Sequence, residues 1–506
     1  MAVLVDESER RLVPAWKSFT NSTPELQPLS SIELEKADIG SYVTDWKSTP
    51  NIANAGDLLS AAIVGNRLDV PEVYEAAQFI VCQHESIPQP LLKKANDIIG
   101  TSSPTFETPF LTNDYSILKR IADLKRLINL YPKDAILQIE IARCYLSLGQ
   151  LVKADLHVRY ALALDCNNRY IVRCAARFYL HIQQLDVALL VVRKSRLTSQ
   201  DPWLMASEIS LSQLNNKTSR YIKKGLQLIE SGKFGKFDLT ELRSAIGTEE
   251  LRNGAYAKCR KLLNDSLIQP NSNSLAQARW ISASKSVELN FDRFDLSTGQ
   301  FVEARSYKAV EDKDYVSAIK FAEKWIEVEP YSTRTILYAY NIASNYLKDN
   351  NKGIEILSNA YKTHKSNPVI LNDYAYSLAL NGQTERAQEV IRKAKTDGSR
   401  DSDIIDICIT ATKGLIAFRA GNADTGSRLY QDAIERSMKH SDRPSLNHSA
   451  LLNYCRELLV YSNTVECREV VTNIIDKIPL DQSNAELVKL KDEVVSLLTK
   501  NELILE

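Results

Sequence analysis

The chain has 506 residues, with 63 Lys or Arg and 63 Asp or Glu, so its formal net charge at neutral pH is zero. This balance removes the global electrostatic argument for nucleic acid or an anionic membrane as the main partner. Single cores stop growing near ~250 to 300 residues, so this length predicts several domains or an array that grows by adding units. Glycine and proline number only 17 and 16 and fall mostly between apolar-periodic segments, which predicts a chain of short helices.

The first residues, MAVLVDESERR, lack the long apolar core of a secretory signal. No later segment approaches the ~20 apolar residues of a membrane span. We therefore expect a cytoplasmic protein with no membrane partner. The eight cysteines are scattered and form no Cys-x-x-Cys pair, so we expect reduced thiols in helix-packing positions.

The region 1–50 contains the Ser/Thr/Pro-rich stretch SFTNSTPELQPLSS between segments that carry Trp16 and Trp46. We expect it to be an arm or cap whose tryptophans dock on the first helices. Residues 51–110 are expected to form helices without a clear repeat, and GTSSPTFETPF at 100–110 is expected to be a linker.

Two later stretches share one pattern of small, large, Gly, small, large and small residues. They are Ala142, Tyr145, Gly149, Ala154, Val158, Ala161 and, with identical spacing, Ala375, Leu378, Gly382, Ala387, Ile391, Ala394. Small residues permit two helices to approach closely, while the large ones close the hairpin. The glycine can adopt the left-handed conformation that ends a first helix. Another copy begins at Ala176, with Gln183 in place of the turn glycine.

This pattern resembles the tetratricopeptide repeat, a helical hairpin of about 34 residues that stacks on its neighbours. The resemblance implies an all-α fold, a right-handed superhelical solenoid of antiparallel helix pairs with an N-terminal helical cap. Looser copies predict about eight or nine hairpins between residues 101 and 480. We assign a first half to 111–288 and a second half to 289–480, with the aperiodic FDRFDLSTGQ at 291–300 as a hinge. Apolar residues at helical spacing predict a C-terminal capping helix within 481–506.

Motifs for catalysis are missing from the sequence. The six histidines form no HExxH and no zinc-finger spacing with cysteine, and neither GxxxxGK[ST] nor GxGxxG occurs. His157 and His181 fall in adjacent repeats, but a helical histidine without a partner motif is usually structural. We expect no catalytic residue, no metal site and no cofactor.

In such arrays the first helix of each hairpin lines a concave groove, and helical periodicity identifies the residues that share its inward face. In the first half this face collects Arg143, Arg173 and Arg177. Guanidinium groups suit carboxylate or phosphate, so one hypothesis is a site for an acidic peptide. The alternative is that these arginines pair with carboxylates on neighbouring helices. Some family members grip a C-terminal carboxylate with lysines and asparagines, which this face does not provide.

In the second half the same face collects tyrosines and asparagines, namely Tyr307, Tyr338, Tyr376, Asn345 and Asn372. Tyrosines give rigid contact area, and asparagines can bond both groups of an extended backbone, which predicts a peptide track. The alternative is that the tyrosines pack between successive repeats.

The leading functional hypothesis is a non-enzymatic scaffold or adaptor that binds protein or peptide segments in its groove, within a multi-protein complex. The alternative is a regulatory or sensor subunit whose partner supplies the enzymatic chemistry. Nucleic-acid binding is disfavoured by the net charge, although a local basic stretch runs from Lys217 to Lys236.

Overall fold

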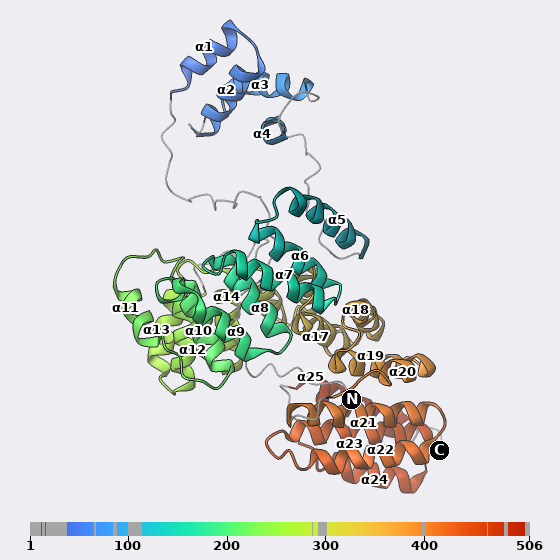
Figure 1. The fold of residues 1–506 in the computed structure, drawn as a ribbon. Helices are drawn as coiled ribbons and strands as arrows, with labels where there is room; N and C mark the ends of the chain where they lie inside the picture. Colours follow the sequence, from blue (N-terminus) through green and yellow to red (C-terminus); the bar gives the residue numbers. More distant parts are fainter. Residues whose placement is uncertain are drawn as a thin grey trace. The chain divides into compact units, whose positions relative to one another are not determined.

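The computed structural model describes residues 12, 16, 38–64, 67–83, 89–99, 114–285, 287–291, 301–396, 400–462, 464–479 and 484–500. Within these residues every regular element is a helix, which confirms the predicted all-α fold (Figure 1). The chain divides into two compact units, one formed by Met1–Ser18 with Leu111–Glu506 and the other by Phe19–Phe110. In the described part of the chain, no helix is both long enough and apolar enough to span a membrane.

The described residues of the smaller unit form four helices: α1 (Gly40–Ser48), α2 (Ile52–Val64), α3 (Pro71–Cys82) and α4 (Gln89–Ile99). Trp46 of α1 is buried against Phe79 of α3, with ring centroids 5.2 Å apart. The structure thus groups α1 with the helices that follow it, where the sequence suggested a boundary at residue 50. The predicted linker at 100–110 lies outside the described residues.

The larger unit is built from consecutive helix pairs joined by short turns. The pairs are α6 (Ala135–Ser147) with α7 (Leu151–Leu164), α8 (Arg169–His181) with α9 (Leu185–Lys194), α10 (Pro202–Leu214) with α11 (Ile222–Glu230), α12 (Thr240–Arg252) with α13 (Tyr256–Ser266), α15 (Val302–Glu311) with α16 (Tyr315–Val328), α17 (Thr333–Asn341) with α18 (Asn350–Thr363), α19 (Pro368–Leu380) with α20 (Thr384–Ile391), α21 (Arg400–Arg419) with α22 (Ala423–Ser437), and α23 (Pro444–Tyr461) with α24 (Val465–Ile475). The remaining elements are α5 (Asp114–Leu130), the 3₁₀-helix η3 (Arg196–Ser199), α14 (Ser272–Lys285), the π-helix η4 (Ile342–Tyr346) and α25 (Ala485–Lys500).

Within the described residues, the turn of eight of the nine pairs contains one residue in the left-handed backbone region. It is a glycine in four turns, at positions 149, 254, 382 and 421, and a non-glycine residue at positions 183, 216, 313 and 348. Except after position 348, the next backbone N–H donates to a carbonyl five residues earlier, as Gln150 does to Tyr145 at 2.9 Å and Gln184 to Tyr179 at 2.8 Å. This is the hydrogen bond of a glycine-type helix end. Gln183, with a φ of 60°, keeps the turn in a conformation that costs an L-residue energy.

Acidic and amide side chains begin several of the first helices. Asp134, Asn168, Asp201 and Asn367 each accept hydrogen bonds from two backbone N–H groups in the first turn of α6, α8, α10 and α19. Such caps satisfy donors that the helix itself leaves unpaired. They fix where each repeat begins.

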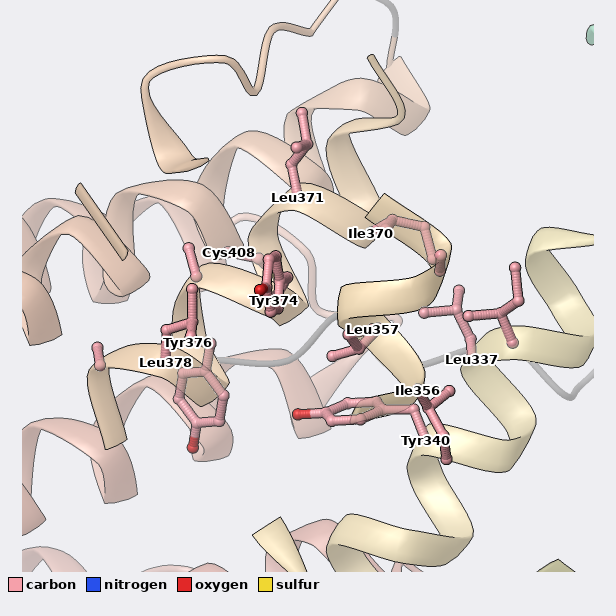
Figure 2. Close-up of a cluster of buried hydrophobic side chains, with 14 of the residues drawn as sticks. Leu337, Tyr340, Ile356, Leu357, Ile370, Leu371, Tyr374, Tyr376, Leu378 and Cys408 are labelled. Carbon is pink, nitrogen blue, oxygen red and sulfur yellow. The ribbon is translucent and has the colours of Figure 1, made fainter. Parts of the chain in front are cut away.

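First and second helices of a pair differ in burial. In α6 every residue from Gln138 to Ser147 is buried, whereas α7 buries a single stripe of Ala154, Val158 and Ala161. The same holds for α19, which is buried throughout its central part, and α20. Figure 2 shows the core around α19, where Tyr340, Tyr374 and Tyr376 lie among aliphatic side chains. The first helices α6 and α19 are therefore covered on their inner face as well as on the face toward their partners.

The junction between the two predicted halves is irregular. Between α14 and α15 the described stretch 287–291 is not helical, and Val287, Leu289 and Phe291 pack on the apolar clusters of α14. The rest of the predicted hinge, 292–300, lies outside the described residues. Both halves belong to the same compact unit.

Candidate functional site: the inner face of the helix pairs

The three inner-face arginines are not equivalent. Arg173 is buried and forms two hydrogen bonds with the Glu241 carboxylate, at 2.8 and 3.0 Å. Its guanidinium group also lies over the Trp203 ring, 5.0 Å from the centroid. Arg177 donates to Glu329 at 3.3 Å and lies over the Tyr331 ring at 5.5 Å. These two arginines have the paired environment that the alternative hypothesis describes.

Arg143 has a different environment. Its side chain is buried, at 4% exposure, and its Nε makes no hydrogen bond with the described residues. It lies on α6 within electrostatic range of Tyr331 and Cys174. The three arginines therefore do not form one open cationic site for an acidic ligand, because each is covered by other parts of the chain.

Trp16, near the N-terminus of the chain, covers part of the inner face of the first half. The Trp16 side chain is fully buried and meets Phe178 of α8 edge to face, with ring centroids 6.5 Å apart. Its ring also lies 5.9 Å from Tyr331, and the Tyr331 hydroxyl donates to the Trp16 carbonyl oxygen at 3.0 Å. Trp16 therefore packs inside the larger unit, on α8 and on Tyr331 before α17, whereas the sequence analysis expected it on the first helices of the chain.

Leu12 provides a second anchor. It is 3% exposed and lies in an apolar cluster with Met205 and Ile209 of α10 and Leu242 of α12. Leu12 and Trp16 therefore occupy neighbouring parts of the inner face, the first at α10 and α12 and the second at α8. These two apolar anchors are four residues apart in the chain.

The Trp16 site lies where two distant parts of the larger unit meet. His181 at the end of α8 contacts Tyr331 edge to face at 5.8 Å and lies 6.2 Å from the ring of His364. Burial lowers the pKa of His181 to about 3, with Arg177 and His364 adding to this effect. His364 Nε2 lies 3.0 Å from the Tyr331 carbonyl oxygen, and its Nδ1 lies 3.2 Å from the Ala360 carbonyl oxygen. Both rings are neutral at physiological pH.

The predicted tyrosine track is also covered. Tyr338 and Tyr376 are each 6% exposed and Asn372 is fully buried, while Tyr307 and Asn345 are partly buried. Tyr307 and Tyr338 meet edge to face at 5.2 Å. These contacts between α15 and α17 correspond to the alternative in which the tyrosines pack between repeats.

Tyr376 belongs to a buried polar network with α23. Its hydroxyl donates to Asn453 at 2.9 Å, and Arg456 lies 3.4 Å from the same hydroxyl. Burial raises the pKa of Tyr376 to about 12. Arg456 also pairs with Glu457 at 2.9 Å and with Glu493 of α25 at 3.4 Å.

The C-terminal helix extends this network. α25 packs on α23 through buried Leu487, Leu490 and Val494. It also reaches a part of the chain that the sequence did not connect with it, because Lys489 Nζ donates to the carbonyl of Ser344 in η4 at 2.8 Å. The sequence gives only weak signals for these two contacts. For the N-terminal one the signal is Trp16 in a polar arm, and for α25 it is an amphipathic C-terminal stretch.

Catalytic chemistry receives no positive evidence from the described residues. They contain no cluster of three or more His, Cys, Asp or Glu side chains that could hold a metal ion. Burial raises the pKa of the Cys144 thiol to about 11 and that of Cys455 to about 12, which keeps both protonated and unreactive.

Comparisons with known proteins were made on sequence and on structure. No protein-family model and no curated protein matches the chain. Among solved structures, yeast Tom70 is 13% identical with a TM-score of 0.32, covering 92% of this chain and 98% of that chain. A human IFIT1 dimer with PPP-AAAA is 13% identical with a TM-score of 0.33, covering 92% and 96%. The APC/C hetero-tetramer Cut9–Hcn1 is 11% identical with a TM-score of 0.29, covering 86% and 95%.

At these TM-scores the likenesses carry no argument about ligand or partner. The geometry of the chain itself establishes the architecture, through the left-handed turns of eight pairs, the capped first helices and the small-residue stripe of second helices such as α7. The larger unit is a tetratricopeptide-like array of stacked helix pairs.

Proposed function

We propose that the protein is a non-enzymatic interaction scaffold, and that the inner face of its first half binds a short segment with an aliphatic and an aromatic anchor. The observation that carries this proposal is the seating of Trp16 between Phe178 and Tyr331. A surface that buries a tryptophan completely and also bonds its backbone has the two features of peptide recognition, a side-chain pocket and a main-chain contact.

The chemistry of the segment follows from what the site contains. Aromatic rings and aliphatic side chains surround Trp16 and Leu12, so the anchors of a partner segment are apolar. The nearby arginines Arg173 and Arg177 are already paired with Glu241 and Glu329, so acidic residues of a partner add little. This replaces the acidic-peptide hypothesis with one based on a Leu-x-x-x-Trp arrangement.

The chain's own segment and a partner segment compete for one site. When the binding site of a protein is open in only a fraction of the molecules, the apparent affinity for a ligand is reduced by that fraction. The N-terminal segment therefore sets the affinity for a partner. The alternative remains a regulatory subunit of an enzymatic complex. A competing N-terminal segment would equally suit a subunit that controls a partner enzyme.

A direct test uses the full-length chain with Trp16→Ala and a fluorescent peptide of residues 8–20 carrying the native sequence. The variant vacates the aromatic site, so we expect the peptide to bind it at least about tenfold more tightly than it binds the wild-type chain, whose site is filled. Fluorescence anisotropy measures both affinities. A variant with Leu12→Ala vacates only the aliphatic anchor and should bind the peptide with intermediate affinity.

The matched control is the same peptide with Trp16→Ala, which should bind neither chain. Circular dichroism establishes that the variants keep their helix content. If the folded Trp16→Ala chain binds the native and control peptides equally weakly, Trp16 is a fixed part of the core and the proposal is wrong.

A further inference from the structure

One arginine at the Trp16 site has no counter-charge. The side chain of Arg143 on α6 is 4% exposed. Its guanidinium group forms neither a hydrogen bond nor an ion pair with the residues that the structure describes. A buried charged group without a partner is costly, because it has lost its hydration and gained no interaction in return. Such a group marks a place where a ligand of opposite charge has something to gain.

The equivalent position of the next repeat shows which group is missing. Arg143 and Arg177 each follow the small packing residue of their helix, Ala142 or Ala176, by one position. Arg177 donates to the carboxylate of Glu329 at 3.3 Å. In the described part of the chain, no carboxylate forms the corresponding ion pair with Arg143. The same position in two repeats is therefore neutralised in one and uncompensated in the other.

The carboxylate of Glu140, one turn before Arg143 on α6, has a different partner. Glu140 is 3% exposed and accepts a hydrogen bond from the Tyr170 hydroxyl at 2.7 Å. Burial raises the pKa of Tyr170, and the charge of Glu140 adds to the rise. The Tyr170 hydroxyl therefore stays protonated and remains the donor to Glu140. This bond leaves Arg143 without the carboxylate of its own helix.

Arg143 lies near the backbone of the docked segment. The Tyr331 hydroxyl donates to the Trp16 carbonyl oxygen at 3.0 Å. Burial raises the pKa of this hydroxyl, Glu329 adds to the rise, and the positive charges of Arg177 and Arg143 oppose it. Both arginines thus act on the group that holds the segment. Because the Trp16 carbonyl belongs to the peptide bond with the next residue, side chains beside the aromatic anchor begin close to these charges.

The chain's own segment cannot neutralise Arg143 from this place. Residues 12–20 read LVPAWKSFT and contain no Asp or Glu, and their one charged residue is Lys17. A partner segment with a carboxylate beside its aromatic anchor can form a charge-assisted hydrogen bond that these residues lack. Arg173 and Arg177 offer no such gain, because each already has a carboxylate. The difference favours the partner segment over the segment that it displaces.

We propose that Arg143 binds a carboxylate of the partner segment, and that this segment carries an acidic residue directly before its aromatic anchor or at one of the two positions after it. The inference rests on the proposed function, since it names the charge of the segment that binds the same site. It adds a single acidic residue to the Leu-x-x-x-Trp arrangement. The recognised chemistry is then one aliphatic side chain, one aromatic side chain and one carboxylate.

The test uses the full-length chain with Trp16→Ala and fluorescent peptides of residues 8–20. Three Glu peptides carry Ala15→Glu, Lys17→Glu or Ser18→Glu, and three Gln peptides carry Gln at the same positions. The Gln peptides match the Glu peptides in size and also remove the charge of Lys17. We expect at least one Glu peptide to bind at least about tenfold more tightly than its Gln counterpart, as measured by fluorescence anisotropy.

The matched control is a chain with both Trp16→Ala and Arg143→Met, which should bind each Glu peptide and its Gln counterpart equally. Comparing the two chains isolates the interaction between Arg143 and the carboxylate. Arg143→Met alone should leave the Tm of the chain unchanged or raise it, because methionine removes an unpaired buried charge. A clear fall in Tm would show that Arg143 already has a partner in the folded chain, which overturns the inference.

The outcomes separate this inference from the proposed function. If the native peptide binds the Trp16→Ala chain but no Glu peptide exceeds its Gln counterpart, the proposed function stands and the role of Arg143 is wrong. A gain that survives Arg143→Met also overturns that role, since another cation then binds the carboxylate. If no peptide binds the folded Trp16→Ala chain, the proposed function and this inference both fail.

Discussion

The Tyr331 hydroxyl donates to the carbonyl oxygen of Trp16 at 3.0 Å, which joins two residues that are 315 positions apart in the chain. Both residues are fully buried. Through this bond the N-terminal segment, the inner face of α8 and the chain before α17 form one packed site.

Removing that hydroxyl provides the first prediction. Tyr331→Phe keeps the ring but leaves the Trp16 carbonyl without its donor, so we expect a loss of about 1–3 kcal/mol in unfolding free energy. Chemical denaturation measures it. Tyr430→Phe is the control, because the Tyr430 hydroxyl is equally buried but has no hydrogen-bond partner among the described residues. Equal losses in both variants would show that the Trp16 bond contributes nothing.

The two turn glycines of the clearest repeats should differ in tolerance. At Gly382 a Cβ meets nothing within 4 Å, so Gly382→Ala carries the left-handed backbone penalty alone, about 1–2 kcal/mol. At Gly149 a Cβ would lie 2.1 Å from the Thr363 carbonyl oxygen, so Gly149→Ala also forces the two segments apart. We expect a clearly larger drop in Tm for Gly149→Ala. Similar drops for both would mean that the contact with Thr363 is loose.

The small-residue packing positions provide the third prediction. Ala154 and Ala387 are fully buried at helix crossings, so replacing either with Leu should overpack the crossing and cost about 1–3 kcal/mol. Val152, two residues before Ala154 in α7, is 85% exposed, and Val152→Leu should leave stability unchanged. Thermal denaturation of the three variants decides whether the repeat register is correct.

The buried ion pair provides the fourth prediction. Arg173→Ala leaves the buried Glu241 carboxylate without its main partner, so we expect a loss of about 3–5 kcal/mol. The exposed pair Arg159–Asp155 is the control, and Arg159→Ala should produce no measurable change. If Arg173→Ala unfolds at the same denaturant concentration as wild type, Arg173 is available for a ligand after all.

Acid should weaken the site around Tyr331. Because the folded pKa of His181, about 3, lies below its unfolded value of 6.5, the unfolded chain binds more protons between these values. Stability therefore rises with pH across this window and is lost as pH falls from 6.5 toward 3. His181→Phe keeps a ring against Tyr331 and removes the proton site. Its Tm should depend less steeply on pH between 4 and 6.5 than the wild-type Tm, and identical slopes would contradict the assignment.

The sequence by itself determined the local architecture. Ala154, Ala387 and the turn glycines predict helix pairs because packing distance and backbone conformation depend on residues close together in the chain. Even Gln183 keeps the predicted turn, since the surrounding helix-end hydrogen bonds hold its backbone in the left-handed region.

The tertiary structure decided what the inner face contacts. Helical periodicity places Arg173 and Tyr376 inward, but it does not reveal that Glu241 or Asn453 lies opposite them. Nor does it place Trp16 against Tyr331, or Lys489 of the last helix against Ser344. These contacts join residues far apart in sequence, and they form only because stacking brings distant pairs together. Whether an inward residue meets a partner or the chain itself is therefore set by the folded path and not by the repeat pattern.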